Sequence, residues 1–108
     1  MAELDPAVVA KHKAAHAGEV HLLTTKKSGI QVLCKTPGEG EWARFLDERG
    51  DPKMKGRALR NLFLSCLLAP DPKEFYQVLG TKPALAEVFA NELVEIAGAT
   101  EEAEAKKA

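Results

Sequence analysis

The chain has 108 residues, of which 45% are hydrophobic and 29% charged, and this composition is ordinary for one globular domain. Fifteen basic and sixteen acidic residues leave a formal net charge of −1, which excludes a general attraction for nucleic acid or anionic membranes. The longest apolar run is far too short to cross a membrane, and the first residues lack the apolar core of a signal peptide. We therefore expect no membrane segment and no secretion.

The first predicted element is a helix over residues 6–17. Asp5 can accept hydrogen bonds from its free N–H groups, Pro6 suits the first helical position, and Gly18 ends the helix. The apolar stripe of this helix is thin. We therefore treat residues 1–18 as an amino-terminal helix or arm.

Residues 19–35 change from a helical period to an alternating one. Two alternating runs, 20–25 and 30–35, flank the turn segment Lys26-Lys27-Ser28-Gly29. Such a pattern predicts a β-hairpin. A lone hairpin is marginally stable in water, so it must lie on helices or pair with another strand.

Four short helices are predicted after the hairpin. Thr36 and Glu39 form a capping-box pattern before the first of them, which carries Trp42 and Phe45 as its apolar anchors. The second helix, over residues 54–68, is apolar around much of its circumference. A helix of this kind is either central in the core or shared with a partner.

The third and fourth helices have their own start and stop signals. Asp71 caps a short helix that ends at Gly80, and Pro83 begins the last helix, which Gly98 closes. The residues that recur at helical spacing on the last helix are Leu85, Val88, Phe89, Leu93 and Ile96.

These elements predict an α+β fold that is mostly helical. We expect an N-terminal helix, one β-hairpin and then about four short helices packed as a small bundle. The single α+β domain spans residues 19–98. Residues 99–108 contain no large apolar side chain, so we expect a disordered charged tail.

No constellation of catalytic residues stands out. Cys34 and Cys66 each lie inside an apolar run, where a thiol is a buried core residue. His12 and His16 share a helix face but have no acidic residue between them, and His21 lies beyond the helix end. We therefore expect no catalytic residues, no cofactor and no metal.

One basic segment, residues 53–60, could contact nucleic acid. Acidic residues within 47–51 directly precede it and dilute its field, so a mixed solvated surface is the preferred interpretation.

Surplus apolar side chains point instead to binding of another protein. Leu64 and Leu68 lie off the main stripe of the helix over residues 54–68, and Tyr76 is adjacent to Phe75, from which it must point away. We predict that Leu64, Leu68 and Tyr76 bind a partner. The alternative is that the domain buries all of these side chains itself.

The order of elements and several motifs resemble a known family, the small tail assembly chaperones of long-tailed bacteriophages and prophages. The likeness covers roughly residues 20–107. The motifs that carry it are Glu41-Trp42-Ala43-Arg44-Phe45, the aliphatic run over 58–70, Lys82-Pro83-Ala84-Leu85 and the segment 92–98 before a charged tail.

The resemblance implies a non-enzymatic role in the cytoplasm of the bacterial host. Proteins of this kind bind and shield the tape measure protein during tail morphogenesis and leave as tube subunits replace them. They self-associate, so the resemblance also implies a homo-oligomer. The alternatives are another small phage structural component, namely a head–tail connector or tail terminator subunit, or a small nucleic-acid-binding regulator.

Overall fold

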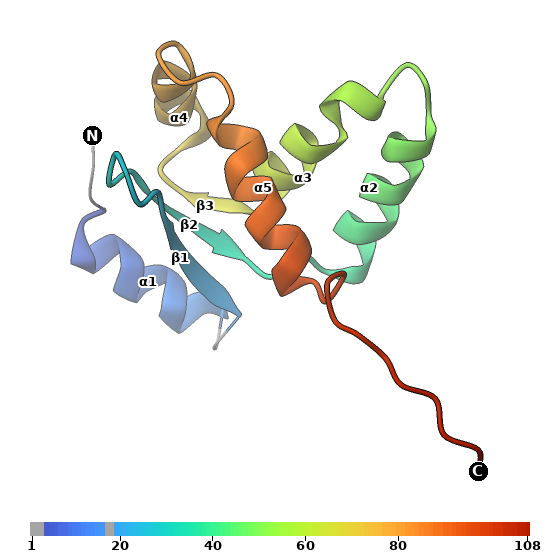
Figure 1. Cartoon of the computed structure of the whole chain (residues 1–108). Helices are drawn as coiled ribbons and strands as arrows, with labels where there is room; N and C mark the ends of the chain where they lie inside the picture. Colours follow the sequence, from blue (N-terminus) through green and yellow to red (C-terminus); the bar gives the residue numbers. More distant parts are fainter. Residues whose placement is uncertain (1–3, 17–18) are drawn as a thin grey trace.

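The polypeptide runs from an N-terminal helix into a β-hairpin and then through four short α-helices (Figure 1). The computed structural model describes residues 4–16 and 19–108. This arrangement confirms the predicted α+β fold. The elements are α1 (Pro6–His16), β1 (Val20–Thr24), β2 (Gln31–Lys35), α2 (Glu39–Gly50), η1 (Lys55–Arg57), α3 (Ala58–Cys66), β3 (Leu67–Ala69), α4 (Pro72–Leu79) and α5 (Leu85–Ile96).

The hairpin is present as predicted, and it belongs to an antiparallel sheet of order β1-β2-β3. Gly29 closes the turn with a φ of +69°, a value that residues with a Cβ rarely adopt. In the register of the hairpin, Leu22 lies opposite Leu33 and Leu23 lies opposite Val32. The turn chemistry and the alternation therefore agree on one pairing.

The third strand corrects the predicted helix over residues 54–68. That segment begins with the 3₁₀ turn η1, continues as α3 to Cys66, and then becomes β3. Ala69 precedes Pro70, and the residue before a proline is disfavoured in the helical region. The chain therefore becomes extended, and β3 pairs with the side of β2 that the hairpin leaves free.

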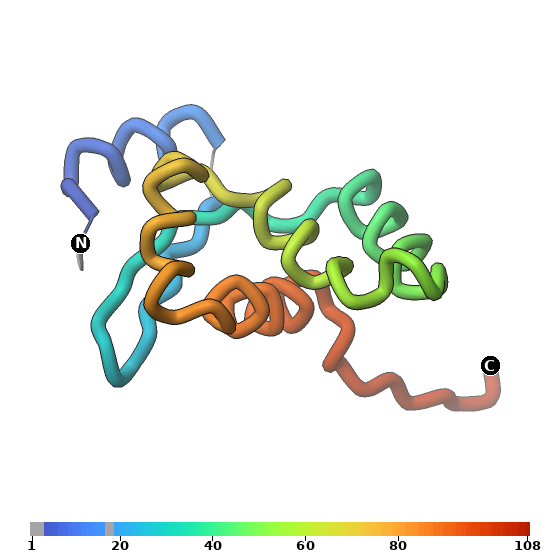
Figure 2. Tube along the Cα trace, turned by 90° about the horizontal axis from the view of Figure 1, so that it is seen from above, coloured from blue at the N-terminus to red at the C-terminus, as the bar shows by residue number. Residues whose placement is uncertain are grey.

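The two faces of the sheet carry different helices. Val32 and Cys34 belong to the main hydrophobic core, on the face that α5 crosses (Figures 1 and 2). Leu33 is fully buried on the opposite face, where α1 lies. The chain at the start of α1 is held there because the Leu4 N–H donates to Gln31 Oε1 at 3.0 Å.

Three phenylalanines from three helices form the centre of the core. Phe63 of α3 lies 4.9 Å from Phe75 of α4 and 5.6 Å from Phe89 of α5, measured between ring centroids. On α2, Phe45 is buried, and Trp42 is half-buried with its ring 5.1 Å away. The ring contacts therefore join α3, α4 and α5, and α2 belongs to the same core through Phe45.

The predicted caps are confirmed at two helices and wrong at a third. Asp5 and Asp71 each accept a backbone N–H two residues ahead, at 2.9 Å. The expected cap at Thr36 is wrong, because α2 begins at Glu39 with Gly38 as its N-cap. Glu41, in place of Glu39, accepts the Gly38 N–H at 3.1 Å, since only the third helical position reaches back to that donor.

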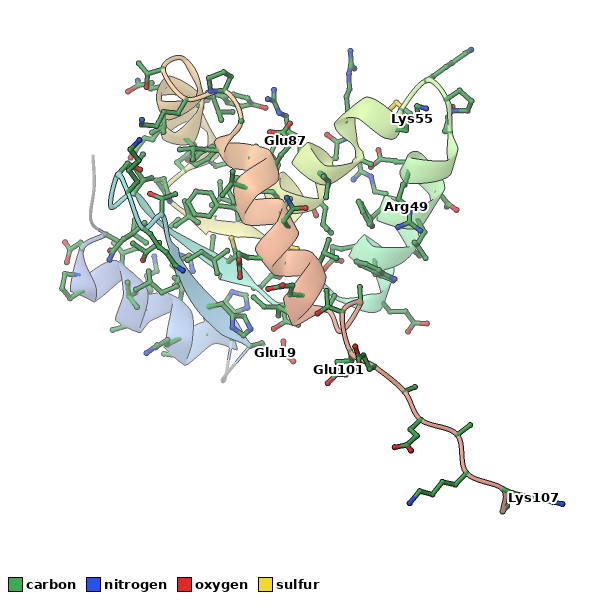
Figure 3. The ribbon with its side chains drawn as sticks, viewed as in Figure 1. Glu19, Arg49, Lys55, Glu87, Glu101 and Lys107 are labelled. Atoms are coloured by element: carbon green, nitrogen blue, oxygen red, sulfur yellow. The ribbon has the colours of Figure 1, made fainter. Side chains whose placement is uncertain are left out.

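The last residues of the chain extend away from the folded domain. Residues 101–108 form no helix or strand and are exposed, and Figure 3 shows Glu101 and Lys107 extending away from the helices. The predicted helix end at Ala17-Gly18, and with it the boundary after residue 18, lies outside the described residues.

We expect Phe63→Ala to lower the free energy of unfolding by about 3–5 kcal/mol, because the substitution leaves a cavity among packed rings. Urea denaturation measures this difference. Tyr76→Ala, at a side chain that is 52% exposed, is the matched control and should change stability by less than about 0.5 kcal/mol. Equal effects of the two substitutions would contradict this assignment of the core.

A second prediction concerns the ion pair between Lys35 Nζ and Glu41 Oε1, at 2.7 Å. The hydrogen bond from Lys35, followed by that from the Gly38 N–H, holds the pKa of Glu41 below its usual 4.5. The same pair raises the pKa of Lys35 above 10.5. The stabilisation is therefore present between these ordinary values and is lost at more acidic and more alkaline pH.

We expect Glu41→Gln to lower the free energy of unfolding near neutral pH by about 0.2–1 kcal/mol, since the pair is partly exposed. The difference from the parent should shrink as the pH falls through the lowered pKa of Glu41. Chemical denaturation at several pH values measures it. Glu39→Gln in the same helical turn is the control, and an identical pH profile for both variants would refute the role of the pair.

Candidate functional site

An open groove of about 920 Å³ lies between the hairpin and α5. We call it the β1–α5 groove. Its walls are β1, the β1–β2 turn and one face of α5, on which the lining residues recur every three or four positions. Its apolar lining residues are Leu22, Leu23, Leu85, Val88 and Phe89.

Two of these apolar side chains are unusually accessible to solvent. Leu22 is 47% exposed and Val88 is 48% exposed. Val88 recurs at helical spacing with Leu85, Phe89 and Leu93, but unlike these three it is not buried. Val88 lies in the first turn of α5, at the edge of the face that packs on the core. Its side chain is therefore open to solvent, and it lines the groove.

Three lysines stand at the rim of the groove. Lys26 and Lys27 come from the β1–β2 turn, and Lys82 comes from the loop that precedes α5. None of the ion pairs found in residues 4–16 and 19–108 involves these ammonium groups. Glu92 is the single carboxylate on the lining, so the groove combines an apolar floor with an excess of positive charge.

The three side chains predicted to bind a partner lie elsewhere. Tyr76 is 52% exposed on α4, whereas Leu64 is half-buried against the core. Leu68 is half-buried in β3, so the argument that placed it on a helix face with Leu64 is wrong. None of the three lines the β1–α5 groove.

Sequence reasoning missed the groove, although one signal for it is present. Leu22 and Leu23 are adjacent in a strand, where successive side chains point to opposite faces. With Leu23 packed on the core, Leu22 must face away from it. Nothing in the sequence shows that Val88 approaches the same place, because that depends on how α5 crosses the sheet.

The two cysteines are free and buried, as predicted. Burial raises the pKa of the Cys34 thiol, and the neighbouring Cys66 raises it further. Burial also raises the pKa of Cys66. The thiolate form of each residue is therefore suppressed near neutral pH.

The histidines take structural positions. His12 and His16 have ring centroids 6.2 Å apart on α1, and His21 Nε2 hydrogen bonds to Thr36 Oγ1 at 2.8 Å. Across the described ranges, 4–16 and 19–108, no three side chains of histidine, cysteine, aspartate or glutamate come together as metal ligands.

Residues 11–106 match the model of a family described as a domain of unknown function (DUF6848). The chain belongs to the DUF6848 family. No curated protein is significantly similar to it.

One solved structure is similar in fold to this DUF6848 chain. It is an uncharacterised protein, rbstp2171, from Bacillus stearothermophilus, with a TM-score of 0.75 and 23% sequence identity. The match covers 91% of this chain and 99% of that chain. At this level of identity the likeness supports the fold alone.

The basic segment of this DUF6848 chain is partly engaged within the domain. Arg60 donates to the Pro83 carbonyl at 3.1 Å and lies 3.6 Å from Glu87, which Figure 3 shows on α5 facing α3. Lys53 and Lys55 are exposed. In the described part of the chain, no helix is both long enough and apolar enough to span a membrane.

We expect both thiols to resist modification in the folded protein, because they are buried and their pKa values are raised. Labelling with a chromogenic disulfide reagent at about pH 8 should be slow in buffer and rapid in denaturant. Fast labelling of either cysteine under native conditions would contradict its place in the core.

Proposed function

We propose that this DUF6848 protein is a tail assembly chaperone-like adaptor. It binds and shields the tape measure protein of a long-tailed phage or prophage during tail morphogenesis, in the cytoplasm of the bacterial host. The observation that supports this function most is the β1–α5 groove, whose floor leaves Leu22 and Val88 about half exposed. Exposed apolar side chains gathered in one hollow are typical of protein-binding surfaces.

The make-up of the groove favours binding over chemistry. Its ionisable side chains are the three rim lysines and Glu92, while the floor is apolar. Burial of the floor by a partner supplies the driving force, at about 25 cal/mol for each Å² removed from water. We therefore propose a non-enzymatic role.

The charge balance of the protein suits a temporary shield. A net charge of −1 leaves little repulsion between copies, which supports the proposed homo-oligomer. A modest groove also allows release, because apolar contacts over a small area are readily exchanged for those of another protein.

Co-expression with a candidate tape measure protein, encoded beside a gene of this family, tests the function. We expect the soluble fraction of the tape measure protein to rise several-fold. Val88→Asp should abolish this rise, because a charge on the floor opposes burial of the partner's apolar surface. A tape measure protein that stays insoluble with the parent protein would refute the proposal.

Two further variants show which surface acts. Leu46→Asp changes an apolar residue that is 40% exposed outside the groove, so it should keep full activity. Tyr76→Asp tests the surface predicted from the sequence.

Purified phage particles provide an independent measurement: a chaperone is absent from them, whereas stable incorporation would indicate a connector or terminator subunit instead.

A further inference from the structure

We propose that the outer edge of β1 binds an extended segment of a partner chain as an added strand, with acidic residues of that segment beside the rim lysines. This inference rests on the proposed function, because it names the kind of segment by which the partner is held.

The hydrogen bonds at both ends of the hairpin fix which backbone groups of β1 point to β2. The Thr25 N–H donates to the Ile30 carbonyl at 3.0 Å, and the Thr36 N–H donates to the Glu19 carbonyl at 2.8 Å. Both pairs belong to the same register. In antiparallel sheets such hydrogen-bonded pairs alternate with pairs whose groups point outward. The odd-numbered residues from 19 to 25 therefore face β2.

The even-numbered residues of β1 consequently present their N–H and C=O groups to the outside. In the described part of the chain, these groups have no backbone hydrogen-bond partner. Unpaired groups in a row are a template for another strand. The residues concerned are Val20, Leu22 and Thr24.

The two edges of the sheet differ in how they are protected. β3 has three residues, an irregular register beside Leu33 and Cys34, and Pro70 directly after it. Each of these features hinders strand addition. β1 has five residues, a regular register and neither lysine nor proline within it. Strand addition is therefore favoured at β1.

The groove lies against this open edge. Leu22, Leu23, Thr24 and Thr25 all line it, although successive side chains of a strand point to opposite faces. A hollow that touches all four must border the edge of the strand itself. An added strand there covers Leu22 on one face of the sheet and Val88 of α5 on the other.

The rim charges define the composition of the segment. Lys26 and Lys27 lie in the turn that follows β1, one residue after its end, and Lys82 lines the same groove. A strand antiparallel to β1 places its amino-terminal end beside these lysines. Carboxylates at that end, followed by alternating apolar residues, complement the charge and the floor.

A synthetic peptide tests the proposal. It is blocked at both ends and has two amino-terminal glutamates followed by alternating valine and threonine. We expect it to bind the purified protein in calorimetric titration and to slow amide hydrogen exchange at Leu22 and Thr24 by at least about tenfold, with little change at Leu23. Binding without protection of these amides would show another mode, such as a docked helix, and would overturn the proposal.

Variants separate the backbone contact from the charges. Leu22→Pro removes an outward donor but no hydrogen bond to β2, and it should weaken binding by about tenfold, whereas Leu22→Val should keep affinity within about twofold. Replacing Lys26 and Lys27 with glutamate should also weaken binding of the peptide by about tenfold. This variant should then bind a peptide with lysines in place of the glutamates more tightly than it binds the original peptide. If Leu22→Pro does not fold, the exchange pattern and the charge reversal decide.

Further outcomes are distinct from a failure of the proposed function. Protection of the Leu22 amide in the free protein, together with a dimeric mass, would show that a second copy occupies the edge and would overturn the inference. Absence of peptide binding also overturns it, even where co-expression succeeds. Peptide binding that follows the predicted pattern stands by itself if the tape measure protein remains insoluble.

Discussion

Phe63, Phe75 and Phe89 reach the centre of the protein from three different helices, with ring centroids between 4.9 and 6.2 Å apart. Because these rings are fully or almost fully buried, they fix where α5 crosses the sheet. The position of α5 in turn leaves its Leu85–Glu92 face beside the hairpin, where it forms one wall of the β1–α5 groove. The surface proposed to bind a partner is thus a consequence of core packing.

A sheet of three strands has two edges, and the residues at these two edges differ. The apolar run after α3 becomes a short strand ended by Pro70, so one edge is brief and irregular. The other edge is a regular strand, and a lysine pair stands in the turn that follows it. Lysine near an edge opposes pairing with basic or neutral strands and favours acidic ones. The same residues therefore limit aggregation and select a partner.

Much of the fold could be predicted from local signals. Alternation and Gly29 define the hairpin, and Asp5 and Asp71 mark helix starts, because these signals depend on neighbours in the sequence. The third strand could not be predicted in this way, because Leu67–Ala69 continues the apolar pattern of the preceding helix. It is extended because Pro70 follows it and because β2 has an unpaired side with which it forms hydrogen bonds. The groove was missed for the same reason: Leu22 and Val88 line one groove only because of how α5 packs beside the hairpin.

The strength of binding expected at this surface fits a temporary association. β1 is five residues long, and only its even-numbered residues point their backbone N–H and C=O groups outward. An added strand can therefore form few backbone hydrogen bonds, each of which contributes a net stabilisation of about 0.5–1.5 kcal/mol. Leu22 and Val88 add apolar burial over a small area. Ordering an extended segment offsets part of this gain. The balance favours a contact that holds a partner chain while it is unprotected and yields to a larger, better packed interface.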